Sequence, residues 1–136
     1  MSVKQISVFV QSEPGHLVRV LEAFEQANVS VRGYSASETA DFGIVRFIVD
    51  KPDEAISVLQ GLGCAATTSD VLCIKLADNP GELRRVIGIL SDCDVNVVYS
   101  YSLISTYIAA YVDDVDSAEK ILSEQPVEMI SQSDLA

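Results

Sequence analysis

The sequence contains 136 residues, of which 49% are apolar, and its 20 acidic and 9 basic side chains give a formal net charge of −11. This acidic balance argues against a nucleic-acid partner, because binding to phosphates requires clustered Lys and Arg, and it equally argues against an anionic membrane surface. No apolar run approaches the roughly 18 residues of a membrane-spanning helix, and no signal-like segment opens the chain, so we expect a cytoplasmic protein.

The first half of the chain predicts the order strand, helix, strand, strand, helix, strand. Apolar and polar residues alternate over residues 6–10, as in a half-buried strand, and residues 12–15 then form a turn that leads into a helix. This half is completed by a period-two pattern over residues 29–37, an apolar run over residues 44–49, a helical stripe over residues 55–62 and a short strand over residues 64–68. The first helix has an apolar stripe at i, i+3, i+4 and i+7, formed by Leu17, Val20, Leu21 and Phe24.

The sequence matches itself when it is shifted by 66 residues, which places Pro14-Gly15 on Pro80-Gly81. Beyond residue 43 the shift becomes 63, and this change falls near residues 38–43, where the loop of a β-hairpin tolerates a length difference. Pairs at the second shift include Val49 with Val112, Asp50 with Asp113, and Leu59 with Leu122. We therefore predict two copies of one fold, residues 1–70 and 71–136.

The second copy repeats the order of the first. Strands are predicted over residues 72–76, 95–104, 107–112 and 127–130, and helices follow the turn at 78–81 and the acidic segment at 113–116. The first of these helices has its apolar stripe at Leu83, Val86, Ile87 and Leu90. The βαββαβ order predicts an α+β protein of two tandem ferredoxin-like domains, each an antiparallel sheet with both helices on one face.

The junction between the copies and the faces of their strands predict how the two copies pack. Only Ser69 and Asp70 separate the strand signals of the two copies, and no Gly- or Pro-rich linker lies between them. The predicted strands have apolar side chains on both faces, as at Val98, Tyr99 and Tyr101. Because a sheet with a solvated face would alternate more cleanly, we expect the sister unit or another chain to cover the helix-free face, and we predict a homodimer.

Three widely spaced cysteines and one histidine limit the available chemistry. Cys64, Cys73 and Cys93 stand among apolar residues, which is typical of buried free thiols in a reducing compartment. No CxxC spacing occurs and His16 is the only histidine, so we predict no metal site, no cofactor and no catalytic triad. The chain is therefore not expected to be an enzyme.

The turn after the first strand of each copy resembles the D/N-x-P-G-x-L motif of the ACT domain family. Residues 78–83 read Asp-Asn-Pro-Gly-Glu-Leu, and residues 12–17 form a degraded copy, Ser-Glu-Pro-Gly-His-Leu. With the repeat and the order of elements, the whole chain is similar to small stand-alone tandem ACT proteins that lack a catalytic domain. This resemblance implies a regulatory, allosteric protein that binds a small amino acid at an interface between domains, with a possible partner enzyme.

The physics of the turn agrees with that implied function. A helix that begins there exposes unpaired amide hydrogens and partial positive charge, which suits a carboxylate, and Gly81 allows a ligand to approach the backbone. Asp78 or Asn79 can then bind an α-amino group. The candidate ligand-binding residues of the turns are Asp78, Asn79, Pro80, Gly81, Glu82 and Leu83 in the second copy, and Ser12, Glu13, Gly15 and His16 in the first. The resemblance implies that the ligand lies between such a turn and a strand of a neighbouring unit, which adds the polar strand residues Tyr34, Ser35 and Ser37, or Ser100 and Ser102.

Two further features have competing interpretations. His16 could contact a ligand, although a lone solvent-facing helix histidine is the commoner case. Asp113, Asp114 and Asp116 could suggest a divalent cation, although Asp residues before a helix more often cap it. The rival function for the whole chain is a ligand-free interaction module that dimerises or serves as the regulatory subunit of a partner enzyme.

Overall fold

The structure is a computed structural model that describes residues 2–11, 15–38 and 42–136. The chain forms two compact units. The N-terminal unit contains residues 4–69 together with 135–136, and the C-terminal unit contains residues 70–134 together with the N-terminal segment up to Val3. No helix in the described ranges is long and apolar enough to cross a membrane.

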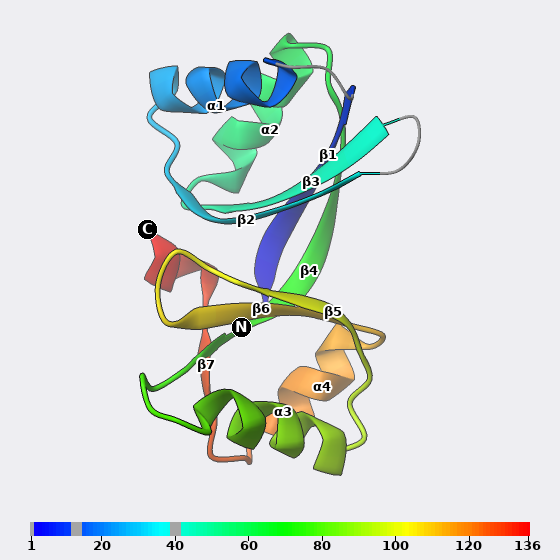
Figure 1. Cartoon of the computed structure of the whole chain (residues 1–136), viewed down its shortest axis with the longest axis vertical. Helices are drawn as coiled ribbons and strands as arrows, with labels where there is room; N and C mark the ends of the chain where they lie inside the picture. The colour runs from blue at the N-terminus through cyan, green and yellow to red at the C-terminus, as the bar shows by residue number, and fades with distance from the viewer. Residues whose placement is uncertain (1, 12–14, 39–41) are drawn as a thin grey trace. The chain divides into compact units, whose positions relative to one another are not determined.

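The N-terminal unit has a ferredoxin-like sheet covered by two helices. Strand β3 pairs antiparallel with β1 and β2, and β4 lies next to β1, which gives the order β2-β3-β1-β4. Figure 1 shows both helices of this unit on one side of its strands. The elements are β1 (Val3–Gln11), α1 (His16–Gln26), β2 (Val31–Glu38), β3 (Phe42–Val49), α2 (Pro52–Gly61) and the first part of β4 (Ala65–Lys75).

The C-terminal unit repeats this arrangement. Strand β4 pairs with β6 and β7, and β5 pairs with β6, so the order is β5-β6-β4-β7, and both helices again lie on one side (Figure 1). The elements after β4 are α3 (Glu82–Asp92), β5 (Val97–Ser102), β6 (Tyr107–Val112), α4 (Val115–Leu122), β7 (Glu128–Ile130) and a short 3-10 helix, η1 (Gln132–Leu135). The predicted α+β class and the doubled βαββαβ order are confirmed.

Each helix pair packs apolar side chains onto its own sheet. In the N-terminal unit, Phe24 of α1 meets Phe47 of β3 edge to face, with ring centroids 5.2 Å apart. Leu90 and Ala110 hold the corresponding positions in the C-terminal unit and are also buried. The N-terminal core consists of Ile6, Val8, Val10, Val20, Phe24, Val29, Val45, Phe47, Val49, Ala55 and Leu59.

The helix stripes are narrower than predicted. Val86 and Leu90 are buried, but Leu83 is 54% exposed and Ile87 is 37% exposed; in α1, Leu21 is 38% exposed. Each helix contacts its sheet along one side only, so a single i, i+4 pair carries most of the packing. The outer apolar positions of α1 and α3 therefore remain at the surface.

The junction between the copies also differs from the prediction. The two expected strands over residues 64–68 and 72–76 form one continuous strand, β4. Ser69 and Asp70 are polar, but neither residue blocks strand geometry as Pro would, so the extended backbone continues through them.

The faces of the sheets that the helices do not cover also carry buried apolar residues, as predicted. Ile48, Cys73 and Ala109 are fully buried, although they alternate with the residues that face the helices. Tyr99 stacks on Tyr111 on the same face of the β5–β6 hairpin, with ring centroids 5.0 Å apart.

The two copies agree in local detail as well as in order. The strand pair Ala36–Val45 in the β2–β3 hairpin corresponds to Ser102–Ile108 in the β5–β6 hairpin. The N-terminal hairpin continues past this pair through Ser37 and Glu38, which pair with Ile44 and Gly43. The difference in repeat length therefore falls in this hairpin, where the change of shift was predicted.

Candidate ligand site

The helix entrances at the two Pro-Gly turns share an unusual backbone conformation. Gly81 has φ 84° and Gly15 has φ 90°, in the left-handed region that strains residues with a Cβ. Within the described ranges, a Cβ added at either glycine would meet no atom within 4 Å. As far as the described residues show, open space therefore lies beside both glycines.

The first turn of α3 supplies backbone donors at this opening. The first helical hydrogen bond runs from the Arg85 N–H to the Gly81 carbonyl oxygen at 2.9 Å. The amides of Leu83 and Arg84 precede this bond, so no helical carbonyl can accept from them. These two N–H groups, at the positive end of the helix, are suited to a carboxylate.

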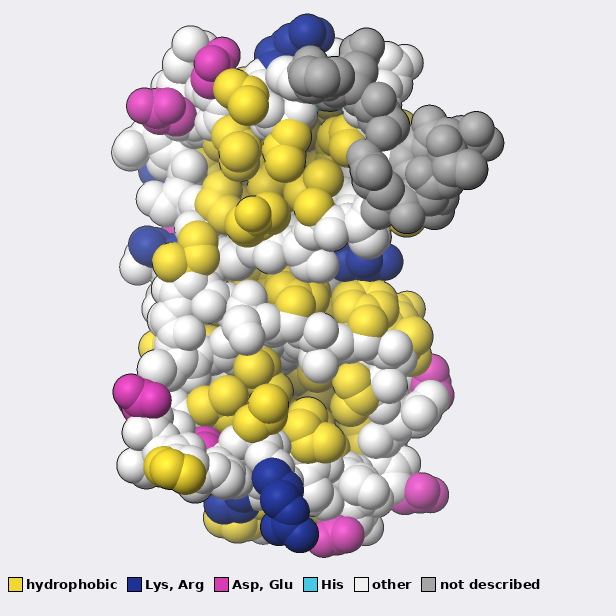
Figure 2. All heavy atoms as spheres, in the orientation of Figure 1, with side chains coloured by type: hydrophobic (Ala, Val, Ile, Leu, Met, Phe, Trp, Pro, Cys, Tyr) yellow, Lys and Arg dark blue, Asp and Glu magenta, His cyan; other side chains and the backbone are white. Residues whose placement is uncertain are grey.

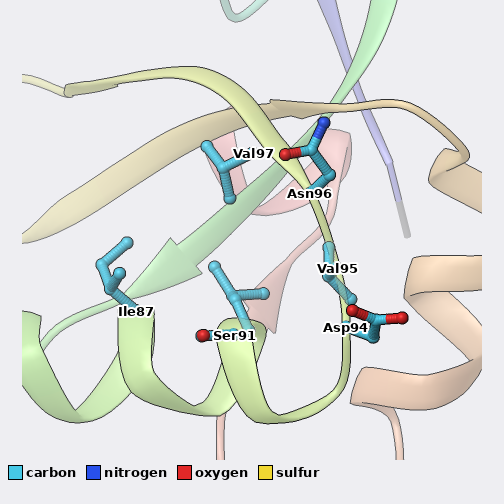
Figure 3. A pocket seen from close by; sticks show the side chains of 7 residues that line it. Ile87, Ser91, Asp94, Val95, Asn96 and Val97 are labelled. Carbon is cyan, nitrogen blue, oxygen red and sulfur yellow. The ribbon is translucent and has the colours of Figure 1, made fainter.

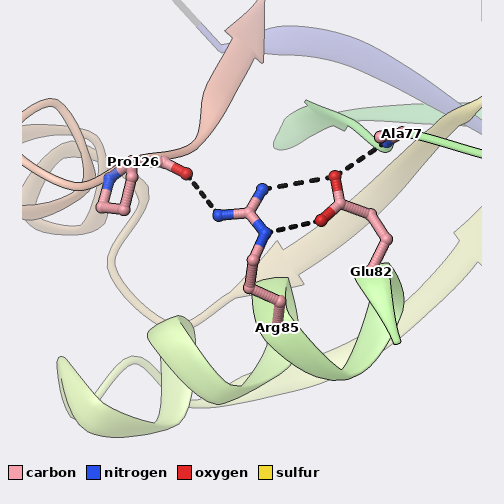
Figure 4. Close-up of polar contacts among 4 residues, drawn as sticks. All are labelled: Ala77, Glu82, Arg85 and Pro126. Carbon is pink, nitrogen blue, oxygen red and sulfur yellow. Dashed lines mark hydrogen bonds and ion pairs between the residues drawn. The ribbon is translucent and has the colours of Figure 1, made fainter. Parts of the chain in front are cut away.

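Glu82, the first residue of α3, ties the turn to its surroundings (Figure 4). Its Oε2 accepts a hydrogen bond from the Ala77 N–H at 2.8 Å, and its Oε1 lies 2.5 Å from Arg85 Nε. Arg85 Nη1 in turn donates to the Pro126 carbonyl oxygen at 2.6 Å. The hydrogen bond from Arg85, and then that from Ala77, lowers the pKa of Glu82. Glu82 thus ties the segment that follows β4 to the first turn of α3.

His16 has the same role in the first copy. Its Nδ1 accepts a hydrogen bond from the Gln11 N–H at 2.9 Å, which matches the Glu82 contact with Ala77. With Nδ1 as the acceptor, a neutral imidazole carries its proton on Nε2. The side chain is half-buried and bound to Gln11, so it is not a free solvent-facing histidine, and its contact with a ligand stays a prediction.

The strand residues of the predicted site lie on different faces. Tyr34 pairs with Phe47 and Ser100 pairs with Ala110, so both lie on helix-covered faces, as does Ser102. Ser35 and Ser37 lie on the opposite face of β2. Because Leu76 N–H donates to Thr106 O at 2.6 Å, the loop that follows Ser102 lies at the sheet end from which the Asp78–Gly81 turn leaves.

The predicted turn residues that the structure describes are exposed, with the exception of Glu82 and His16, which are half-buried. Ser12 and Glu13 lie outside the described residues. Asp78, Asn79, Pro80 and Gly81 are all exposed, as is Leu83. Asp114 caps α4, because its Oδ1 accepts a hydrogen bond from the Ser117 N–H at 3.1 Å, which confirms the capping interpretation for this residue.

A hollow at the opposite end of α3 was not predicted. It has a volume of about 320 Å³ and lies where α3 ends and β5 begins. Figure 3 shows Ile87 and Val97 on one side of the Asp94 turn and the Asp94 carboxylate on the other. No motif covers these residues, and only a comparison of the two copies, position by position, could have drawn attention to them.

Metal ligands do not cluster among the described residues, and one of the three thiols is deeply buried. Among the described residues, no group of three or more His, Cys, Asp or Glu side chains is placed to hold a metal ion. Burial raises the pKa of Cys73 to about 12, which leaves its thiol protonated and unreactive at neutral pH.

The fold and the paired turns define a doubled ferredoxin-like module with open, glycine-capped helix entrances. The family model described as an ACT domain pair matches residues 1–136, so this chain belongs to the ACT domain pair family. The resemblance seen in the sequence is confirmed. No curated protein matched the sequence.

Solved structures share the architecture. A crystal structure of a protein from Bacteroides thetaiotaomicron is 33% identical, with a TM-score of 0.92, and the match covers 99% of this chain and 96% of that one. The regulatory subunit of aspartate kinase from Thermus thermophilus is 17% identical with a TM-score of 0.66, and the match covers 90% of this chain and 89% of that one. The corresponding subunit from Thermus flavus is 16% identical with a TM-score of 0.62, covering 90% of each chain.

Proposed function

We propose that this chain is a non-catalytic, cytoplasmic regulatory protein that binds a small amino acid at its Pro-Gly turns. The observation that carries the proposal is the open, left-handed Gly81 at the N-terminus of α3. The family supports a regulatory role, since the similar Thermus structures are named as regulatory subunits of an aspartate kinase.

The ligand's two charged groups have suitable partners at this turn. Its carboxylate accepts hydrogen bonds from the amides of Leu83 and Arg84, which have no helical acceptor. Its ammonium group binds Asp78 or Asn79, which are exposed. Glu82 does not compete for the ammonium group, because both of its oxygens are already hydrogen-bonded to Ala77 and Arg85. The exposed side chain of Leu83 offers an apolar contact.

The turn of the second copy is the better candidate of the two. It keeps Asp78 and Asn79, whereas Ser12 and Glu13 replace them in the first copy. We therefore expect the turn at residues 78–83 to select the ligand. A ligand at such a site shifts the equilibrium between two conformations of the chain only as far as its affinities for the two conformations differ.

A thermal-shift screen against the twenty amino acids tests this proposal. Binding to the folded state adds about 2.7 kcal/mol to the free energy of unfolding at a ligand concentration of one hundred times Kd, and the melting temperature rises as a result. The matched variant is Gly81→Asn, because Asn tolerates the left-handed backbone while its side chain enters the open space. We expect a shift with at least one amino acid in the native protein and its loss in Gly81→Asn.

A second candidate function is a ligand-free interaction module, in a homodimer or with a partner enzyme. The exposed apolar residues of α1 and α3, including Val18 and Leu83 at 55% and 54%, favour it. Figure 2 shows hydrophobic side chains gathered on the visible face of each unit. If no amino acid at millimolar concentration shifts the melting temperature while light scattering detects a dimer, this second function replaces the first.

A further inference from the structure

Lys51 of the N-terminal unit binds the turn that ends α1. Its Nζ donates to the Asn28 carbonyl oxygen at 3.0 Å. Asn28 is the left-handed residue after the helix, with φ 59°. Carbonyl groups at a helix C-terminus carry partial negative charge, so this end of the unit already contains a bound ammonium group.

The C-terminal unit has the same backbone without the lysine. Asp94 corresponds to Asn28 and has φ 60°. Asp114 corresponds to Lys51, and the two residues have similar backbone angles, φ −132° and ψ 91° against φ −130° and ψ 77°. Because Asp114 is short and caps α4, it does not supply an ammonium group to the Asp94 turn.

A cavity in the C-terminal unit is lined by Asp94 and Asp114, the residues that correspond to Asn28 and Lys51. It has a volume of about 120 Å³, between the Asp94 turn and the start of α4, and its walls include Asn96, Asp113 and Asp114. It adjoins the hollow shown in Figure 3, because Asp94, Val95 and Asn96 line both. Within the described ranges, neither the carbonyl nor the carboxylate of Asp94 accepts a hydrogen bond.

The residues that line the cavity indicate what kind of ligand it can bind. One carboxylate oxygen of Asp113 accepts a hydrogen bond from Asn96 Nδ2 at 2.8 Å, and one of Asp114 accepts from the Ser117 N–H. The second oxygen of each carboxylate is available to a ligand. These acceptors suit a group with several N–H donors, and the described residues form no metal-binding cluster. Ile87, Val95 and Val97 add an apolar wall for a carbon chain. With a volume of about 120 Å³, the cavity has room for an ammonium group and a few carbons.

We propose that the C-terminal unit binds the ammonium group of a small primary alkylamine in this cavity, at the position that Lys51 fills in the N-terminal unit. The site is separate from the Pro-Gly turn, since it lies at the other end of α3. It requires no carboxylate on the ligand, so its test is independent of the proposed amino-acid site.

Titration with propylammonium chloride, followed by amide NMR shifts, tests the site. We expect saturable shifts at residues 94–96 and 113–117 and none at residues 79–84. Sodium chloride and tetramethylammonium chloride at the same ionic strength are the controls, because neither cation has an N–H donor. A response to either control that equals the propylammonium response would overturn the proposal, as would no response to propylammonium.

The key variant is Asp114→Lys, which reproduces the N-terminal unit. Its own ammonium group should occupy the Asp94 carbonyl and weaken propylammonium binding at least about tenfold, or 1.4 kcal/mol. Asp114→Asn keeps a good helix cap and should weaken binding less. Unchanged affinity in a folded Asp114→Lys protein contradicts the proposal.

The reciprocal variant covers the case in which Asp114→Lys does not fold. Lys51→Ala removes the ammonium group from the Asn28 carbonyl oxygen. We expect propylammonium to produce new shifts at residues 28–30 of this variant, which the native protein lacks. The absence of new shifts there would show that the turn does not bind an ammonium group and would overturn the proposal.

Discussion

Asn28 and Asp94 occupy equivalent places in the two units and share a left-handed backbone, with φ 59° and 60°. In both units the following valine closes the helix, since the N–H groups of Val29 and Val95 donate to Phe24 O and Leu90 O at 2.9 Å. The bond spans the whole last turn of the helix, as in a Schellman motif. The copies thus keep the same turn while they differ in charge at it.

The shared turn predicts a gain in stability from glycine. Asp94→Gly should raise the free energy of unfolding by about 0.5–1 kcal/mol, because glycine takes positive φ without the clash of a Cβ. Asp94→Ala should lower it by about 1 kcal/mol. Urea denaturation measures both, and Asn28→Gly and Asn28→Ala are the matched pair in the other unit. An alanine variant as stable as its glycine counterpart would contradict the prediction.

The Glu82 contacts predict a pH dependence. Because hydrogen bonds from Arg85 and Ala77 lower the pKa of Glu82 in the folded chain, its contribution is fully present above the unfolded pKa of about 4.3. That contribution is lost as the pH falls through the lower folded pKa. We expect Glu82→Gln to destabilise the protein at pH 7 and to differ less from the native chain at pH 3. Equal differences at the two pH values would show that the charge of Glu82 contributes nothing.

The thiols should differ in reactivity. Cys73 is buried and its pKa is raised to about 12, whereas Cys64 and Cys93 are half-buried. At pH 8 a disulfide reagent should therefore leave Cys73 unmodified until the chain unfolds. Mass spectrometry of peptides from the native and urea-unfolded protein distinguishes the sites. The Cys73→Ala variant should show the same native rate of thiol modification as the original chain.

The narrow helix stripes predict a contrast between two leucines of α3. Leu90 is 1% exposed, so Leu90→Ala should cost about 2–5 kcal/mol of unfolding free energy through lost burial and a cavity. Leu83 is 54% exposed, so Leu83→Ser should change stability by less than about 1 kcal/mol. Chemical denaturation of both variants checks this, and similar losses would mean that Leu83 packs as the sequence pattern predicted.

The sequence pattern was sufficient for the repeated architecture. Apolar residues at period two and at helical spacing encode which face of each element is buried, and these preferences are local. The shift between the copies then predicted two βαββαβ units, and Pro80-Gly81 marked the entrance of a helix. The place of the length change, near residues 38–43, followed because hairpin loops tolerate insertions.

By itself, the sequence determined the class of fold, the doubling and the residues of the two turns. Only the tertiary structure decided that β4 is one strand, that Leu83 remains exposed, and that Glu82 and His16 bind the preceding strand ends. The reason is that a periodic pattern specifies which side of an element is apolar, but not how much of that side a neighbour covers. Likewise, Lys51 and Asp114 are ordinary surface residues in the sequence, and their different roles follow from where the folded chain places them.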